Sequence, residues 1–233
     1  MDYQNLHVVV TGGTGALGAA VVGRLLAAGA VCHIPYHSEE AAKGFALRNH
    51  QQVSLVAVGN LADEAAVAAF YGGLDTVWAS IHVAGGFAFA PIAQSDKALL
   101  TRQLESNLMS AYLCSRAAVA AFRRGPGPGR IVNVAARQAL EPRLGAGLTA
   151  YTVSKAALAA LTVALAEEVA QEGILVNAVA PSIMDTAANR NSMPKADFDA
   201  WPKVEEVAAT IVFLASPQNA VTRGAVVPVY GKV

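Results

Sequence analysis

Tyr151 and Lys155 are the residues whose types and spacing point most directly to chemistry. They stand four positions apart at the start of a long Ala- and Leu-rich stretch with helical periodicity. On a helix, positions i and i+4 share a face, so the phenol and the ammonium point into the same space. A neighbouring cation favours the phenolate, which lowers the pKa of tyrosine and makes its hydroxyl a usable proton donor. The same spacing also arises by chance in helices, so other residues must decide between the two interpretations.

A glycine-rich loop near the N-terminus provides that support. Residues 6–10 are an apolar run typical of a buried strand, the sequence TGGTGALG follows at 11–18, and helical spacing then continues to Gly29. Glycines let the backbone approach a pyrophosphate closely, and a helix N-terminus favours the anion. A merely tight turn is the alternative, but the strand and the helix stand where nucleotide binding requires them. The loop residues expected to bind a cofactor are Gly12, Thr14, Gly15, Ala16, Leu17 and Gly18.

Together these features resemble the short-chain dehydrogenase/reductase family, and the resemblance covers nearly the whole chain. The loop has the family's glycine pattern, with Ala16 in place of one usual glycine. Residues 83–86, Val-Ala-Gly-Gly, stand where the family has Asn-Asn-Ala-Gly, and Asn107 matches the family's helix asparagine. The segment 177–186, Asn-Ala-Val-Ala-Pro-Ser-x-x-x-Thr, matches the family's segment after the sixth strand.

The resemblance implies hydride transfer between a nicotinamide and a C=O or C=N group of a small molecule. Tyr151 would donate the proton, Lys155 would lower its pKa and bind the nicotinamide ribose, and Asn107 would anchor a water in the proton relay. Thr186 and the backbone around Ile183 would hold the carboxamide. The remaining residues that the resemblance places at the cofactor are Tyr36, His37, Ser38, Asn60, Leu61, Ala84, Gly85, Gly86 and Pro181.

The end of the second predicted strand bears on the cofactor phosphate. Relatives that prefer NAD have an acidic residue there, which holds the two ribose hydroxyls. Here residues 34–38 are Ile-Pro-Tyr-His-Ser, with Tyr36 at that position. A carboxylate would repel a 2′-phosphate, so its absence permits one, and His37 and Ser38 are possible donors. We therefore expect NADP(H) to be preferred over NAD(H), with Asn60 contacting the adenine edge.

The active-site serine of most family members is missing. Counting from the fifth predicted strand puts Ala136 at its position, whereas an alignment that keeps the usual spacing to Tyr151 puts Gln138 there. Alanine offers no hydrogen bond, and glutamine is a longer amide. Dihydropteridine reductase, one branch of the family, also lacks this serine, and its motifs resemble residues 15–18, 83–86 and 185–201. The substrate stays open between a quinonoid pterin and other carbonyl compounds.

Other candidate substrate contacts have a functional and a structural interpretation. Four large apolar residues lie near the predicted covering segment 182–203: Phe87, Phe89, Met193 and Trp201. They would either stack a planar heterocycle or pack as ordinary core. Arg190 would clamp an anionic or carbonyl group, or pair with Asp185 or Asp197. The candidate substrate residues are therefore Ala136, Gln138, Phe87, Arg190 and Trp201.

Alternating strands and helices predict the fold. The expected strands are 6–11, 31–36, 53–58, 76–83, 130–135, 174–180 and 225–230. The expected helices are 16–28, 39–49, 63–72, 97–123, 149–172 and 204–215. Gly125-Pro126-Gly127-Pro128-Gly129 predicts a sharp loop after the fourth helix. Continuous apolar strands indicate a parallel sheet covered on both faces. We predict an α/β protein with a Rossmann-type, doubly wound parallel sheet of about seven strands, in one domain spanning 1–233.

Composition narrows the functional classes. The chain has 233 residues, 54% of them hydrophobic, and zero net charge, so it carries no electrostatic footprint for nucleic acid or an acidic membrane. It shows no signal segment, no uninterrupted apolar run long enough to span a bilayer and no metal spacing, so we expect a cytoplasmic enzyme without a metal. His82, Cys32 and Cys114 fall in predicted core elements. The apolar helices predict a homodimer or homotetramer. The alternative function is a nucleotide-binding sensor without turnover.

Overall fold

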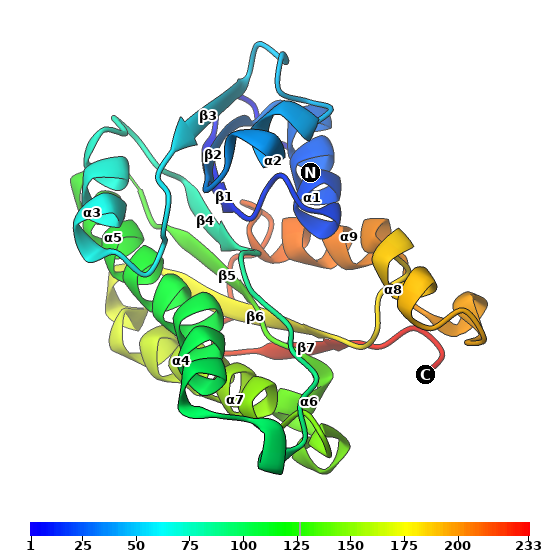
Figure 1. Ribbon diagram of the computed structural model, residues 1–233. Coiled ribbons are helices and arrows are strands. Elements are labelled where there is room, and N and C mark those ends of the chain that lie inside the picture. Colours follow the sequence, from blue (N-terminus) through cyan, green and yellow to red (C-terminus); the bar gives the residue numbers. More distant parts are fainter. Residues whose placement is uncertain (126) are drawn as a thin grey trace.

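A single parallel sheet organises the chain, as seen in the computed structural model, which describes residues 1–125 and 127–233 (Figure 1). Its seven strands have the order β3-β2-β1-β4-β5-β6-β7. The strands are β1 (His7–Thr11), β2 (Val31–Tyr36), β3 (Val53–Ala57), β4 (Ala79–His82), β5 (Arg130–Val134), β6 (Leu175–Pro181) and β7 (Val226–Val229). All neighbouring pairs are parallel. The predicted doubly wound fold is confirmed.

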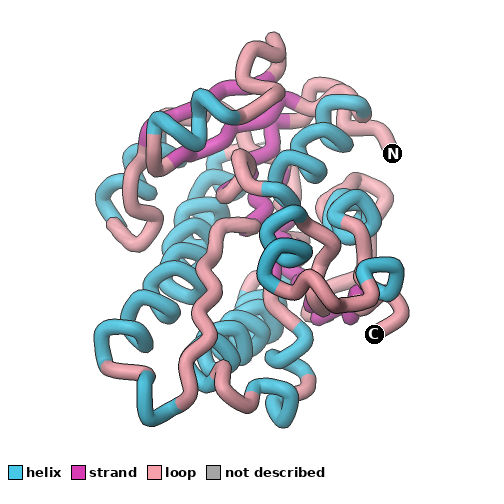
Figure 2. The backbone as a smooth tube through the Cα atoms, turned by 45° about the vertical axis from the view of Figure 1, so that its right-hand side comes forward, coloured by secondary structure: helices cyan, strands magenta, loops and turns pink. Residues whose placement is uncertain are grey.

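Helices cover both faces of this sheet (Figure 1). One layer holds α1 (Ala16–Ala27), α2 (Glu39–Gly44) and α9 (Val204–Leu214), and the other holds α3 (Glu64–Gly72), α5 (Ser110–Arg124) and α7 (Thr149–Glu168). Along β1, Val8 and Val10 pack into the first layer and Val9 into the second. Successive side chains of a strand point to opposite faces, which is why these strands are apolar throughout. Figure 2 shows the sheet twisting between the two layers.

The predicted helix 97–123 is interrupted in the structure. It consists of α4 (Lys97–Leu104), one π-helical turn at Glu105–Met109, and α5. A π turn rotates the residues within it relative to a continuous α-helix. Asn107 sits in this turn, fully buried, where its side chain bonds the backbone of Gly86. Because that partner is distant in sequence, helical periodicity gives no signal for the interruption.

Two other predicted helices are too long. The second ends at Gly44 instead of residue 49, because the chain turns there and buries Phe45 in the first layer. The fifth expected helix, 149–172, ends as an α-helix at Glu168 and continues only as a 3-10 turn, Ala170–Glu172. The predicted strand 76–83 shortens to β4. Pro126 of the predicted sharp loop lies outside the described residues.

Short helices in the loops were not predicted. They are α6 (Arg137–Leu140), α8 (Ala187–Ser192) and 3-10 turns at Ile92–Gln94, Pro142–Gly145 and Phe198–Ala200. Isolated helices of this length are unstable in water, so tertiary packing decides whether they form. Two of them, α6 and α8, follow β5 and β6 at the carboxyl edge of the sheet.

The sequence predicted no segment long and apolar enough to span a bilayer. The helix α7 does not fit that prediction, because its length and composition would allow it to cross a membrane. In the fold it packs along β6 and lies beside α4 and α6. Lys155, Leu158 and Thr162 on its inner face are buried. A helix that packs on a sheet in this way is apolar for the same reason as a membrane helix, so the composition alone does not distinguish the two cases.

A buried chain of hydrogen bonds ties β4 and β5 to α7. Asn133 donates its amide group to Thr162, 2.9 Å away, so its carbonyl oxygen accepts from His82 Nδ1 at 2.8 Å. His82 Nε2 then accepts from Ser80, 2.8 Å away, and Ser80 accepts from Tyr71 at 2.7 Å. Burial lowers the pKa of His82 to about 4, so the imidazole is neutral, as this donor pattern requires. His82 is the hydrogen-bonded core histidine that was expected.

Candidate functional site

A cavity of about 760 Å³ lies at the carboxyl edge of the sheet, a size typical of small-molecule sites. In open α/β sheets this edge is where ligands bind. The predicted residues that line the cavity are Gly12, Thr14, Gly15, Ala16, Leu17, Gly18, Tyr36, His37, Asn60, Leu61, Ala84, Gly85, Gly86, Phe87, Asn107, Ala136, Tyr151, Lys155, Pro181 and Thr186. The predicted residues outside the lining are Ser38, Gln138, Ile183, Arg190 and Trp201. The fold thus brings together residues that are far apart in sequence.

The glycine-rich loop forms one wall of the cavity. Gly12 has a positive φ of 67°, and a Cβ there would lie 2.6 Å from the backbone nitrogen of Ala84. A Cβ on Gly18 would lie 2.1 Å from the carbonyl oxygen of Gly12. Only glycine fits both positions, so the loop lies tight against the end of β4. α1 begins directly after it at Ala16, and its free N–H groups suit a pyrophosphate. The loop fits a dinucleotide on these grounds.

Tyr151 and Lys155 line the same cavity from the first turns of α7. The Lys155 ammonium is buried and donates to the carbonyl oxygen of Val134 at 2.7 Å. Burial lowers the pKa of Lys155 to about 8 and raises the pKa of Tyr151 to about 12. The expected depression of the tyrosine pKa toward neutrality is therefore wrong for this structure, because burial raises the pKa of Tyr151. The phenol keeps its proton at neutral pH.

Asn107 braces the cavity wall from the π turn. Its Oδ1 accepts from the Gly86 amide and its Nδ2 donates to the Gly86 carbonyl, both at 2.9 Å. Nδ2 also lies 3.0 Å from Ser154 Oγ, which donates to the carbonyl oxygen of Tyr151. Asn107 thus links the segment after β4 to the helix that carries Tyr151. The side-chain amide of Asn107, which was predicted to anchor a water, therefore makes hydrogen bonds to protein groups.

The wall beside Tyr151 is aromatic and lacks a hydroxyl at the position of the missing serine. Ala136 is buried and lines the cavity there. The rings of Phe87 and Tyr151 meet edge to face, with centroids 5.1 Å apart. Eleven of the described lining residues were not predicted as site residues, and three of these lie on the helix that was expected to be continuous: Glu105, Ser106 and Ser110. Ser106 Oγ is buried without a hydrogen-bond partner.

The far end of the cavity is lined by Tyr36, His37, Asn60 and Leu61. The Tyr36 hydroxyl donates to the carboxylate of Glu39 at 2.8 Å, and this bond raises the pKa of Tyr36. Ser38 caps α2 by accepting from the Ala41 amide, so its oxygen is engaged in the helix start. Among the described lining residues, the only lysine or arginine is Lys155.

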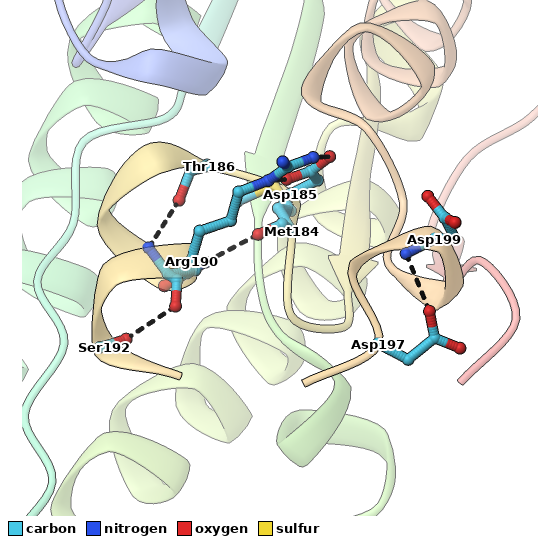
Figure 3. A network of polar contacts seen from close by, with 8 residues as sticks. Met184, Asp185, Thr186, Arg190, Ser192, Asp197 and Asp199 are labelled. Atoms are coloured by element: carbon cyan, nitrogen blue, oxygen red, sulfur yellow. Dashed lines mark hydrogen bonds and ion pairs between the residues drawn. The ribbon is translucent and has the colours of Figure 1, made fainter. Parts of the chain in front are cut away.

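The segment after β6 is shaped by local bonds (Figure 3). Thr186 caps α8 by accepting from the Asn189 amide at 3.2 Å, and Asn189 donates to the carbonyl oxygen of Met184 at 2.8 Å. Arg190 forms a bidentate pair with Asp185, with N–O distances of 2.6 and 2.7 Å. Trp201 is buried and packs against Phe198. The structural alternatives given for Arg190 and Trp201 are thus the observed ones, whereas Met184 and Thr186 line the cavity.

Comparison with known proteins agrees with this geometry. The profile of the short chain dehydrogenase family matches residues 6–197. Galactitol 2-dehydrogenase of Rhizobium johnstonii is 34% identical over 242 aligned residues, which cover 96% of this chain and 93% of that protein. The chain belongs to the short-chain dehydrogenase family, and it is an oxidoreductase.

Solved structures share the fold. A short-chain type dehydrogenase/reductase from Mycobacterium ulcerans superposes with a TM-score of 0.89 at 23% identity, covering 100% of this chain and 90% of that one. ElxO with NADP bound superposes with a TM-score of 0.88 at 21% identity, covering 98% of both chains.

Proposed function

We propose that the protein is an NAD(P)H-dependent reductase that transfers hydride to a C=O or C=N group of a small molecule. The observation that carries the proposal is the placement of Tyr151 and Lys155 in one cavity with the glycine-rich loop. A sensor of nucleotides would need the loop but not a buried proton donor. A nicotinamide dinucleotide, when bound, supplies the hydride. Gly12, Gly18 and the start of α1 would hold its pyrophosphate, and Lys155 its nicotinamide ribose.

The chain's own residues supply the proton. With a pKa of about 12, Tyr151 is protonated at neutral pH and donates to the substrate oxygen or nitrogen as hydride reaches the adjacent carbon. The phenolate that results lies on the helix face of the Lys155 ammonium, whose charge stabilises it. Asn107 acts as a positioning residue, because its bonds fix Gly86 relative to Ser154 and Tyr151. A water at Asn107 would have to use the remaining lone pairs of its oxygen.

Substitution of Tyr151 tests this proposal. Tyr151→Phe removes only the acidic hydroxyl, so NADPH affinity should be retained and turnover should fall to below a tenth. The assay is oxidation of NADPH and NADH with a panel of aldehydes, ketones, quinones and quinonoid dihydropterin. A Tyr151→Phe enzyme above a tenth of wild-type kcat would contradict the role of Tyr151. Wild-type protein that binds NADPH without oxidising it on any substrate would support the sensor instead.

We further propose NADP(H) as the preferred cofactor. Support comes from Tyr36 at the end of β2, where a carboxylate would repel the phosphate, and from His37 in the lining. Glu39 works in the other direction, since it brings a carboxylate to the Tyr36 hydroxyl. The preference should therefore be modest in the wild type and should increase in Glu39→Gln. Steady-state kcat/KM for both cofactors in the two proteins measures it.

We propose that each chain forms one domain spanning residues 1–233, that two or four chains assemble into a homodimer or homotetramer, and that the enzyme is cytoplasmic. Support comes from the outer faces of α5 and α7, where large apolar side chains are exposed: Tyr112 (50%), Val153 (48%) and Val163 (49%). Large apolar side chains that are this exposed on packed helices are favourable positions for contact with another subunit. The proposed transfer of hydride to a C=N group includes the reduction of a quinonoid pterin, the reaction of dihydropteridine reductase.

A further inference from the structure

The substrate end of the cavity has a fixed aromatic wall. Phe87 is 65% exposed and Phe89 68%, although both are large apolar residues. The Phe87 ring lines the cavity and meets Tyr151 edge to face at 5.1 Å. Phe89, two residues farther on, lies outside the cavity lining, and its ring faces Gly147, where a Cβ would lie 3.0 Å from it. The exposed Phe87 ring beside the proton donor is therefore the aromatic surface of the cavity that a flat apolar group would cover.

The segment that carries these rings is held at both ends. The Gly86 amide donates to Asn107 at 2.9 Å, and the Ala90 amide donates to the carbonyl oxygen of Gly147 at 3.0 Å. These anchors fix the backbone on both sides of Phe87, next to Tyr151. A binding surface whose backbone is already in place loses less conformational entropy when a ligand arrives.

The other side chains near Tyr151 determine the polarity of the ligand. Ala136 offers no hydrogen bond to a carbonyl group, so orientation must come from ring contacts and from Tyr151 itself. Glu105, in the π turn two residues before Asn107, is the only acidic residue among the described residues that line the cavity, and its carboxylate disfavours an anionic group beside that turn. Lys155, the only lysine or arginine among the described lining residues, already donates to the carbonyl oxygen of Val134.

We propose that the substrate is an uncharged aromatic carbonyl compound whose ring packs against Phe87 while its oxygen meets Tyr151. This assignment rests on the proposed reductase function. The carbonyl carbon accepts hydride from the reduced nicotinamide, the oxygen accepts the Tyr151 proton, and the products are an aromatic alcohol and the oxidised cofactor. Phe87 is thus the residue that determines substrate specificity.

Pairs of carbonyl compounds that differ only in ring saturation test the proposal. The pairs are benzaldehyde with cyclohexanecarbaldehyde, and acetophenone with cyclohexyl methyl ketone. The quantity of interest is the ratio of kcat/KM within a pair, compared between wild type and Phe87→Leu, because intrinsic reactivity cancels in that comparison. We expect Phe87→Leu to lower the aromatic preference by about threefold to tenfold, as the loss of one aromatic pair predicts. Phe87→Trp should keep the preference.

Phe213→Leu, at an exposed phenylalanine of α9, is the matched control and should change neither ratio. Glu105→Gln should raise kcat/KM for 4-formylbenzoate relative to benzaldehyde. Turnover of carbonyl compounds with the same ratios in wild type and Phe87→Leu would overturn the aromatic assignment while leaving the reductase intact. An absence of NAD(P)H oxidation with every carbonyl compound would instead contradict the proposed function itself.

Discussion

Acidification should weaken folding through the buried imidazole of His82. The side chain is buried, and its two ring nitrogens are hydrogen-bonded to Ser80 and Asn133. Protonation would place a second donor against the Ser80 hydroxyl and a charge in the core. Burial therefore lowers the pKa of His82 to about 4, whereas an unfolded chain has a histidine pKa of about 6.5. A group with a depressed folded-state pKa of this kind binds protons more readily in the unfolded chain.

The size of the effect follows from these two pKa values. Above pH 6.5 His82 is mainly neutral in both the folded and the unfolded state, so its titration does not lower the free energy of unfolding. As the pH falls through that value, the unfolded state takes up the proton first, so stability is lost. One pKa unit corresponds to about 1.4 kcal/mol, which gives about 3 kcal/mol over the whole titration. By pH 5 about 2 kcal/mol of this should already be lost.

Urea unfolding at pH 7 and pH 5, at one protein concentration, measures this loss. His82→Asn replaces the imidazole with an amide that does not titrate, so the variant should lose about 2 kcal/mol less than the wild type between the two pH values. The exposed His50 provides the control, because His50→Gln should keep the full wild-type dependence. Equal losses in wild type and His82→Asn would show that His82 can be charged in the fold, and the buried network would then need a different description.

Four further predictions concern the cofactor, the proton donor and assembly. Gly18→Ala should abolish cofactor binding measured by calorimetry, because its Cβ would lie 2.1 Å from a backbone oxygen, whereas Gly23→Ala, farther along α1 and outside the cavity lining, places its Cβ 4.0 Å from the Leu47 side chain and should retain it. Since the pKa of Lys155 is about 8, kcat/KM for reduction should decline above that pH as the ammonium is lost, and a flat profile to pH 10 would contradict this role. Tyr36→Asp should weaken NADPH use by about tenfold to a hundredfold and affect NADH little, since a nearby like charge costs about 1–3 kcal/mol; a wild type that already favours NADH would refute the phosphate assignment. Light scattering at micromolar concentration should show an oligomer, which Val163→Asp on the exposed face of α7 should dissociate, and a monomeric wild type would exclude that interface.

The sequence alone determined the parallel sheet, the glycine-rich loop after β1 and the placement of Tyr151 and Lys155 on one helix face. Their signals are local: short continuous apolar runs, glycines spaced for a strand-to-helix turn, and Tyr151 four positions before Lys155 on one helix. Such patterns depend on contacts within a few residues. For this reason they can be recognised in the sequence without knowledge of the contacts that the rest of the chain makes.

Only the tertiary structure determined those local structures, pKa values and side-chain contacts that depend on residues distant in the sequence. The π turn around Asn107 exists because Gly86 offers both backbone groups to its amide. The pKa of Tyr151 rises to about 12 although a lysine stands four residues away, because burial is a property of the whole fold. Arg190 and Trp201 looked like substrate contacts, but Asp185 and Phe198 engage them. Side-chain direction and desolvation are set by packing between elements, and a linear pattern carries no record of either.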